Sequence, residues 1–203
     1  MPLTTCEIRW LLDGPLPQEV EGWFQSRGDR TVPTSREDHY LILPGVADMG
    51  IKRREGRLEI KGRTAKLGVH AIAPEIEGVA ERWCKWSYGA AVAESFPRTG
   101  PIVVGKERVQ KHFLLEPGER AQATTQRDLA LRGFSIELTR IRLAGGNHWS
   151  LGIEAAPDDP ALLADLVRAL GDILQGFPLP LPRSCSRSYP AWLARLGPDV
   201  RRA

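Results

Sequence analysis

The sequence lacks the features that mark secreted, zinc-binding or membrane-spanning chains. Its three cysteines stand far apart, with neither a Cys-x-x-Cys pair nor a histidine pair nearby, which argues against a disulfide framework and a zinc site. No run of about 18 apolar residues occurs. Residues 1–12 include Glu7 and Arg9 and do not follow the order of a signal peptide. We therefore expect a soluble, cytoplasmic protein with no membrane partner.

Motifs of widespread enzyme classes are absent too. The four histidines lack the spacing of a metal site or a triad, and no serine stands in a Gly-x-Ser-x-Gly motif. Gly145-Gly146 leads into a predicted strand and not a helix, so it is no dinucleotide fingerprint. The net charge of +3 is too small to predict nucleic-acid binding. The 203 residues, 42% hydrophobic and 26% charged, predict one globular domain over residues 1–203, with the oligomeric state left open.

Short segments of alternating apolar and polar residues, bounded by Gly, Pro and Asp, are the dominant pattern. This period of two predicts strands. The predicted strands span residues 4–12, 36–43, 51–54, 58–63, 81–88, 102–115, 133–143 and 149–155. Glu55-Gly56 and Gly145-Gly146-Asn147 lie where two hairpins would turn. Eight antiparallel strands are enough to close a barrel.

Two segments have helical patterns instead. Residues 17–27 begin with Pro17 and predict a short helix, and residues 158–175 carry one apolar stripe that must pack on another element. Residues 190–196 predict a half-buried turn before a basic, solvated tail. The predicted fold class is α+β: a closed eight-stranded antiparallel β-barrel over about 4–156, with flanking helices and a C-terminal helical segment over about 158–197.

Several predicted strands have one apolar face and one ionic face. In an open sheet the ionic face would meet water, whereas in a barrel wide enough for a ligand it can face inward beneath an apolar outer surface. The second arrangement would set eight cations against Glu7, Glu59, Glu137 and Glu154, and such a lumen would attract a polyanion. The candidate substrate-binding residues are Arg9, Lys52, Arg54, Lys61, Arg63, Lys85, Lys106 and Arg108.

The order of these segments resembles the CYTH-like superfamily of triphosphate tunnel metalloenzymes. The matching pieces are Glu7-Ile8-Arg9, the basic hairpin 50–62, the Lys-x-Arg strand at 104–108, and the closing hairpin from Ile136-Glu137-Leu138 to Glu154. The resemblance covers roughly residues 4–156. It implies a tunnel barrel that holds an anionic small molecule, whether phosphate, polyphosphate or nucleotide, together with Mg²⁺ or Mn²⁺. Glu7, Glu137 and Glu154 would then be both the metal ligands and the catalytic residues.

Two departures from the family pattern bear on the activity. The family's Glu-x-Glu-x-Lys is here Glu7, Arg9 and Leu11, and the closing Glu-x-Glu is Gly152-Ile153-Glu154. Each change removes a carboxylate, and Arg9 places a positive charge where a metal ion would sit. The preferred hypothesis is binding and metal-dependent hydrolysis of a phosphorylated molecule. The alternative is a non-catalytic anion-binding or regulatory module that has lost the metal site, and a third is an adenylyl cyclase.

Overall fold

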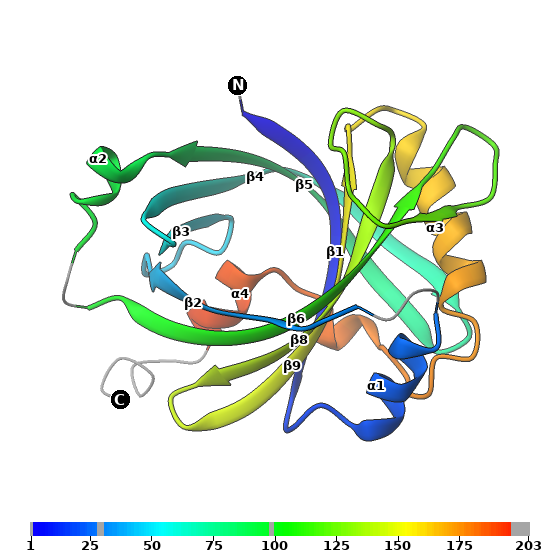
Figure 1. Ribbon diagram of the computed structural model, residues 1–203, viewed down its shortest axis with the longest axis horizontal. Coiled ribbons are helices and arrows are strands. Elements are labelled where there is room, and N and C mark those ends of the chain that lie inside the picture. Colours follow the sequence, from blue (N-terminus) through cyan, green and yellow to red (C-terminus); the bar gives the residue numbers. More distant parts are fainter. Residues whose placement is uncertain (1, 28–30, 98–99, 196–203) are drawn as a thin grey trace.

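The computed structural model describes residues 2–27, 31–97 and 100–195. The strands in these ranges are β1 (Leu3–Asp13), β2 (Thr34–Leu41), β3 (Met49–Arg54), β4 (Arg57–Ala73), β5 (Ile76–Tyr88), β6 (Ile102–Leu114), β7 (Gln122–Thr124), β8 (Gly133–Leu143) and β9 (Gly146–Ala156). They pair in the order β2-β3-β4-β5-β1-β9-β8-β6, and a further antiparallel pairing of β2 with β6 closes an eight-stranded barrel (Figure 1). The remaining strand, β7, lies outside this closed order and pairs with the C-terminal end of β6. The predicted fold class is therefore confirmed.

Two of the hairpin turns have a left-handed backbone at both central residues. Glu55 and Gly56 have φ of 48° and 70°, and Ala144 and Gly145 have φ of 49° and 75°. This twist suits two-residue turns between antiparallel strands. The first turn lies where the sequence predicts it, and the second lies one residue earlier than Gly145-Gly146-Asn147.

The β4–β5 hairpin is much longer than the predicted strands 58–63 and 81–88. Three irregularities in its register, between Arg63 and Ala65, Lys66 and Gly68, and Ala71 and Ala73, interrupt the alternation on which the prediction relied. The extension is useful to the fold because Ile72 and Ile76 join the main hydrophobic core. β7 and the helix α2 (Ala90–Ala93) were not predicted, since each is too short to show a period.

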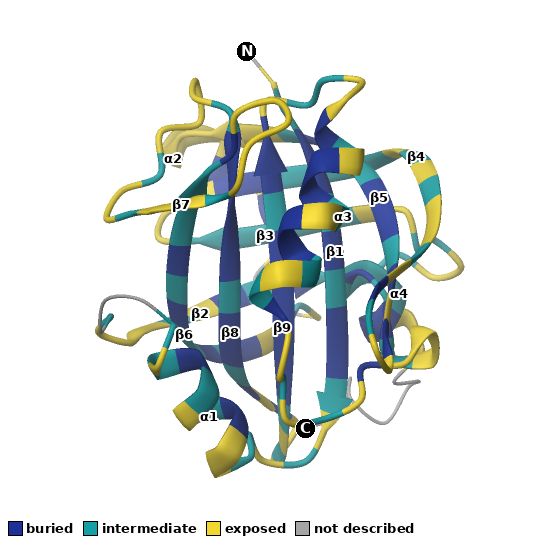
Figure 2. Cartoon of the chain, turned by 90° about the vertical axis from the view of Figure 1, so that its right-hand side faces the viewer, coloured by how far each residue is buried: buried dark blue, intermediate teal, exposed yellow. Residues whose placement is uncertain are grey.

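The main hydrophobic core lies outside the barrel, beneath two helices. α1 (Gln18–Gln25) buries Val20 and Phe24, and α3 (Leu162–Ile173) packs its buried face on β4 and β9. Figure 2 shows α3 on the outside of the barrel. α3 begins at Leu162 and not at residue 158: Asp158 pairs with Arg82 of β5, and the Asp159 carboxylate pairs with Arg132 and accepts from the Ala161 N–H at 2.9 Å, before the helix begins. No helix in the described ranges is long and apolar enough to cross a membrane.

The C-terminal segment enters the barrel between β1 and β5. Pairing of these strands ends at Ile8 and Ala80, and the chain around η1 (Arg183–Cys185) fills the gap: Ser186 bridges Trp10, and the Arg187 N–H donates to the Arg9 carbonyl at 2.9 Å. α4 (Tyr189–Arg195) follows.

The predicted turn at 190–196 is thus a short helix inside one end of the barrel. Its Trp192 and Leu193 form a second hydrophobic cluster with Leu11, Ile141 and other residues on the same strand faces as the charged side chains. Residue 196 and the basic tail, and with them the end of the predicted segment 158–197, lie outside the described residues.

The helix α3 is expected to hold the barrel through its buried leucines. Leu166→Ala should lower the free energy of unfolding by about 2–5 kcal/mol, because Leu166 is fully buried and its loss leaves a cavity. Urea unfolding of this variant and of Asp172→Ala, which alters an exposed residue of the same helix, provides the measurement. Equal stability of the two variants would contradict this placement of the core.

Candidate functional site

A cavity of ≈ 360 Å³ occupies the interior of the barrel. The strands deliver alternate side chains to it, so residues two apart on one strand line it together. The charged lining residues are ten bases and five acids: Arg9, Arg36, Lys52, Arg54, Lys61, Lys85, Lys106, Arg108, Arg127 and Arg187, with Glu7, Glu59, Glu81, Glu137 and Glu154. The ionic faces of the strands therefore point inward, and their apolar faces point outward beneath the helices.

The structure brings together ten of the eleven residues predicted for the site. The exception is Arg63, which does not line the cavity; its guanidinium pairs with Glu81 at 2.7 Å and lies over the Trp83 ring. Arg63 pairs with Trp83 and is the last residue in register before the first irregularity of the β4–β5 pairing. The shared location is a fact of the fold, whereas the chemical roles of the ten residues stay predictions.

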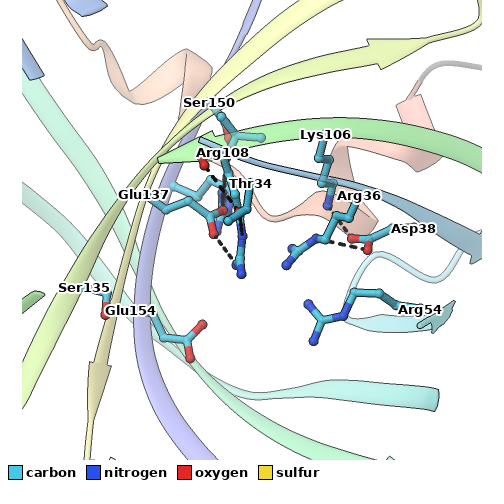
Figure 3. Close-up of polar contacts among 12 residues, drawn as sticks. Thr34, Arg36, Asp38, Arg54, Lys106, Arg108, Ser135, Glu137, Ser150 and Glu154 are labelled. Atoms are coloured by element: carbon cyan, nitrogen blue, oxygen red, sulfur yellow. Dashed lines mark hydrogen bonds and ion pairs between the residues drawn. The ribbon is translucent and has the colours of Figure 1, made fainter. Parts of the chain in front are cut away.

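Asp38 of β2 is the centre of one cluster. Its carboxylate is fully buried and contacts three cations: Lys106 Nζ at 2.8 Å, Lys52 Nζ at 2.9 Å and Arg36 Nε at 3.3 Å. Figure 3 shows Lys106 and Arg36 beside Asp38. Burial opposes its charge, but the neighbouring lysines and Arg36 hold the pKa of Asp38 far below its ordinary value. One carboxylate thus anchors three bases at the same wall of the cavity.

The two lysines of this cluster are only partly compensated. Burial, together with the repulsion between neighbouring cations, lowers the pKa of Lys52 to about 8. Burial also lowers the pKa of Lys106 to about 8, although its ammonium donates to Asp38 and to the Tyr40 hydroxyl. An additional anion beside these lysines would relieve their repulsion and stabilise their charged forms.

Glu137 of β8 is the centre of a second cluster. Its two oxygens accept from Arg9 at 3.3 Å and from Arg108 at 3.1 Å, and Figure 3 shows the Arg108 contact. Burial alone would raise the pKa of Glu137, but the surrounding arginines lower it to about 2. Arg9 also donates to the Ser150 hydroxyl at 3.2 Å. Glu137 is therefore an internal counterion that holds two arginines in place.

The third acidic position joins β1 and β9. Lys61 donates to Glu7, and its ammonium lies 3.9 Å from Glu154, a direct neighbour of Glu7 across the two strands. The Glu154 side chain is 37% exposed, the most open of the three predicted acids. Beside it, as Figure 3 shows, lies Ser135, whose hydroxyl is 2.8 Å from His112 Nδ1.

The predicted metal ligands do not form a metal site in this arrangement. Glu7 is engaged by Lys61, and Glu137 by Arg9 and Arg108. Within the described ranges, no three His, Cys, Asp or Glu side chains are grouped to hold a metal ion. Since Mg²⁺ needs several oxygen ligands that are not already bound to ammonium or guanidinium groups, the donor set does not fit it.

Sequence reasoning missed several residues of the cavity. Arg36, Asp38 and Tyr40 alternate along β2 just as the predicted residues do on their strands, so this signal was present in the sequence. Arg127 belongs to the loop before β8, and Tyr189 to α4, where no pattern marks a barrel residue. Tyr189 places its ring 3.7 Å from Lys106 Nζ, which makes it part of the cavity floor.

Comparison with known proteins supports the fold and gives no activity. No protein-family model and no curated protein matches the chain. The chain is similar to the PH1819 protein of Pyrococcus horikoshii, with a TM-score of 0.51, 16% identity, and coverage of 92% of this chain and 97% of that one. A conserved hypothetical protein of Pyrococcus furiosus has a TM-score of 0.46, 14% identity and coverage of 90% and 97%. The PH1012 protein of P. horikoshii has a TM-score of 0.43 and 16% identity, with coverage of 85% of this chain and 90% of that one. At this identity, the likeness to PH1819 shows a shared fold alone.

The lowered pKa of the buried lysines predicts how stability changes with pH. Above about pH 8 the folded protein releases protons that lysines of the unfolded chain keep up to 10.5, so the free energy of unfolding should rise from neutral pH to about 9. Lys106→Met should reduce this rise, and Lys52 should account for the remainder. Chemical denaturation across this pH range provides the measurement, with Lys66→Met on the exposed part of β4 as the control. An identical pH profile for wild type and Lys106→Met would refute this assignment.

Proposed function

We propose that the barrel binds a phosphorylated, polyanionic small molecule in its cavity. The observation that supports this most directly is the imbalance of charge. Ten bases line the cavity against five acids, and the buried Asp38 raises the acids to six, which leaves an excess of four positive charges. An excess of this kind, confined in a space walled by protein, attracts anions more strongly than the same charges on an open surface. A phosphate, a polyphosphate chain or a nucleotide has the matching charge.

Three of the cavity's bases have no carboxylate partner in the described part of the chain. Lys85 forms no ion pair there, Arg127 donates to backbone carbonyls including those of Gly133 and Ala156, and Arg187 bonds to the Ser184 carbonyl. Their charges are therefore not paired with a carboxylate. Arginine presents several N–H groups in a plane and suits phosphate oxygens, while lysine supplies a compact charge. In this proposal Lys85 and Arg187 make the first contacts. Arg127, whose terminal N–H groups already donate to backbone carbonyls, contributes charge, and the paired bases complete the neutralisation.

The second candidate function is hydrolysis of a phosphoanhydride bond. The observation in its favour is the partly exposed carboxylate of Glu154. Its carboxylate is the most open of the three predicted acids and lies beside Lys61. In this reading Glu154 accepts a proton from an attacking water, and the neighbouring cations stabilise charge that develops on the phosphate oxygens. Glu7 and Glu137 act only through the bases that they hold. A regulatory module that binds without turnover needs neither of these steps.

Binding is tested with a residue whose removal disturbs no ion pair. Lys85→Gln should weaken binding of tripolyphosphate by about tenfold, because one charged contact is lost while the rest of the cavity is kept. Isothermal titration calorimetry measures the affinity. Lys66→Gln makes the same change at an exposed position of β4 and should have no effect. If both variants bind tripolyphosphate with the affinity of the wild type, the proposed location of the site is wrong.

Turnover is tested separately from binding. The purified protein is incubated with tripolyphosphate, ATP or thiamine triphosphate plus Mg²⁺ or Mn²⁺, and release of phosphate, pyrophosphate and cyclic AMP is followed. Loss of phosphate release in Glu154→Gln, with tripolyphosphate affinity retained, supports hydrolysis. Thermal stabilisation by these ligands without product supports the non-catalytic module, and cyclic AMP formation would support the cyclase instead.

A further inference from the structure

The two departures from the family pattern lie against each other in the barrel. Arg9 of β1 and Gly152 of β9 are direct partners across the two strands. A methyl group added at Gly152 would lie 2.5 Å from the guanidinium carbon of Arg9, well inside contact distance. As placed in the barrel, the guanidinium occupies the space that a side chain at residue 152 would enter. A side chain at residue 152 would have to move Arg9, so the two residues form a coupled pair.

Arg9 is held in this place from several directions. It donates to Glu137 at 3.3 Å and to Ser150 at 3.2 Å, and its guanidinium carbon lies 5.0 Å from the centre of the Tyr189 ring. Its side chain is only 15% exposed. The nearby Glu137 outweighs the effect of burial and raises the pKa of Arg9 above its ordinary value. The cavity therefore contains a fixed positive charge at every physiological pH.

This charge stands beside an acid that a metal ion would need. Glu137 is also the direct strand partner of Gly152. Arg9 therefore lies beside Glu137 and beside residue 152, where the family pattern has a second acid. A divalent cation approaching Glu137 would be repelled by two guanidinium groups and would have to displace at least one of them. Glu59 is no more accessible to a metal ion than Glu137, because Lys52 and Arg54 already pair with it.

We infer that Arg9 takes the place of a divalent metal ion as a built-in cation, so that the cavity binds its polyanion without metal. This inference rests on the proposed function and adds that binding is metal-independent. The guanidinium supplies positive charge and directed N–H donors to phosphate oxygens. Glu137 and Ser150 orient it, and Gly152 leaves the space that it fills.

The first experiment compares tripolyphosphate binding with and without metal. Affinity is measured by calorimetry in chelating-resin-treated buffer and again in the same buffer with Mg²⁺. We expect binding in the metal-free buffer that is at least as tight as with Mg²⁺, and no thermal shift from Mg²⁺ alone. Binding that requires Mg²⁺ would overturn the inference and leave the proposed function intact. Absence of binding in both buffers would overturn the proposed function and the inference with it.

The second experiment changes the coupled pair. Arg9→Gln should weaken metal-free binding by about tenfold or more, whereas Arg140→Gln, which alters an ion-paired arginine outside the cavity, should not. The double variant Arg9→Ala with Gly152→Glu replaces the cation with an acid beside Glu137 and Glu154. We expect it to bind tripolyphosphate only with Mg²⁺ and to gain thermal stability from Mg²⁺ alone. Metal-free affinity that is unchanged in Arg9→Gln contradicts the inference whether or not the double variant folds.

Discussion

The constraint that shapes this protein is that each carboxylate inside the closed barrel must be matched by cations. A buried, unpaired charge costs several kcal/mol, so each inward-facing acid is placed where bases from other strands can reach it. Asp38 meets cations from β2, β3 and β6, and Glu137 meets arginines from β1 and β6. These contacts fix the strands relative to one another as well as the side chains. The same pairing keeps the cavity open, because ionic side chains cannot collapse into an apolar core.

The inward-facing charges of the barrel also explain why the helices lie where they do. With charge inside, the apolar faces of β1, β8 and β9 point outward and need a cover, which α1 and α3 supply. α4 does the opposite, since it places Trp192 and Leu193 inside the barrel and closes one end. Helices outside therefore provide the stability of a hydrophobic core, while the helix inside limits the depth of the cavity.

The alternation of residues in the sequence was enough to predict the eight barrel strands and ten of the residues that line the cavity, and the helical patterns were enough to predict α1 and most of α3. It was not enough for the β4–β5 extension, where bulges break the period, or for β7 and α2, which are too short. Asp38 carries the same signal as its neighbours on β2 and could have been found. Tyr189 and Arg127 could not, because their place in the cavity depends on long-range packing. Nor could the sequence show that Arg9 and Gly152 are in contact, since 142 positions separate them along the chain.

The gap between β1 and β5 has a consequence for the order of assembly. The first strand of the barrel is completed by Ser186 and Arg187, so the wall joins residues made early with residues made late. During synthesis, which proceeds from the N-terminus, the strands up to β9 emerge before the segment that seals this seam and before the aromatic floor of the cavity. The wall between β1 and β5 and the part of the cavity that Tyr189 lines can therefore be completed only when residues 183–195 have left the ribosome.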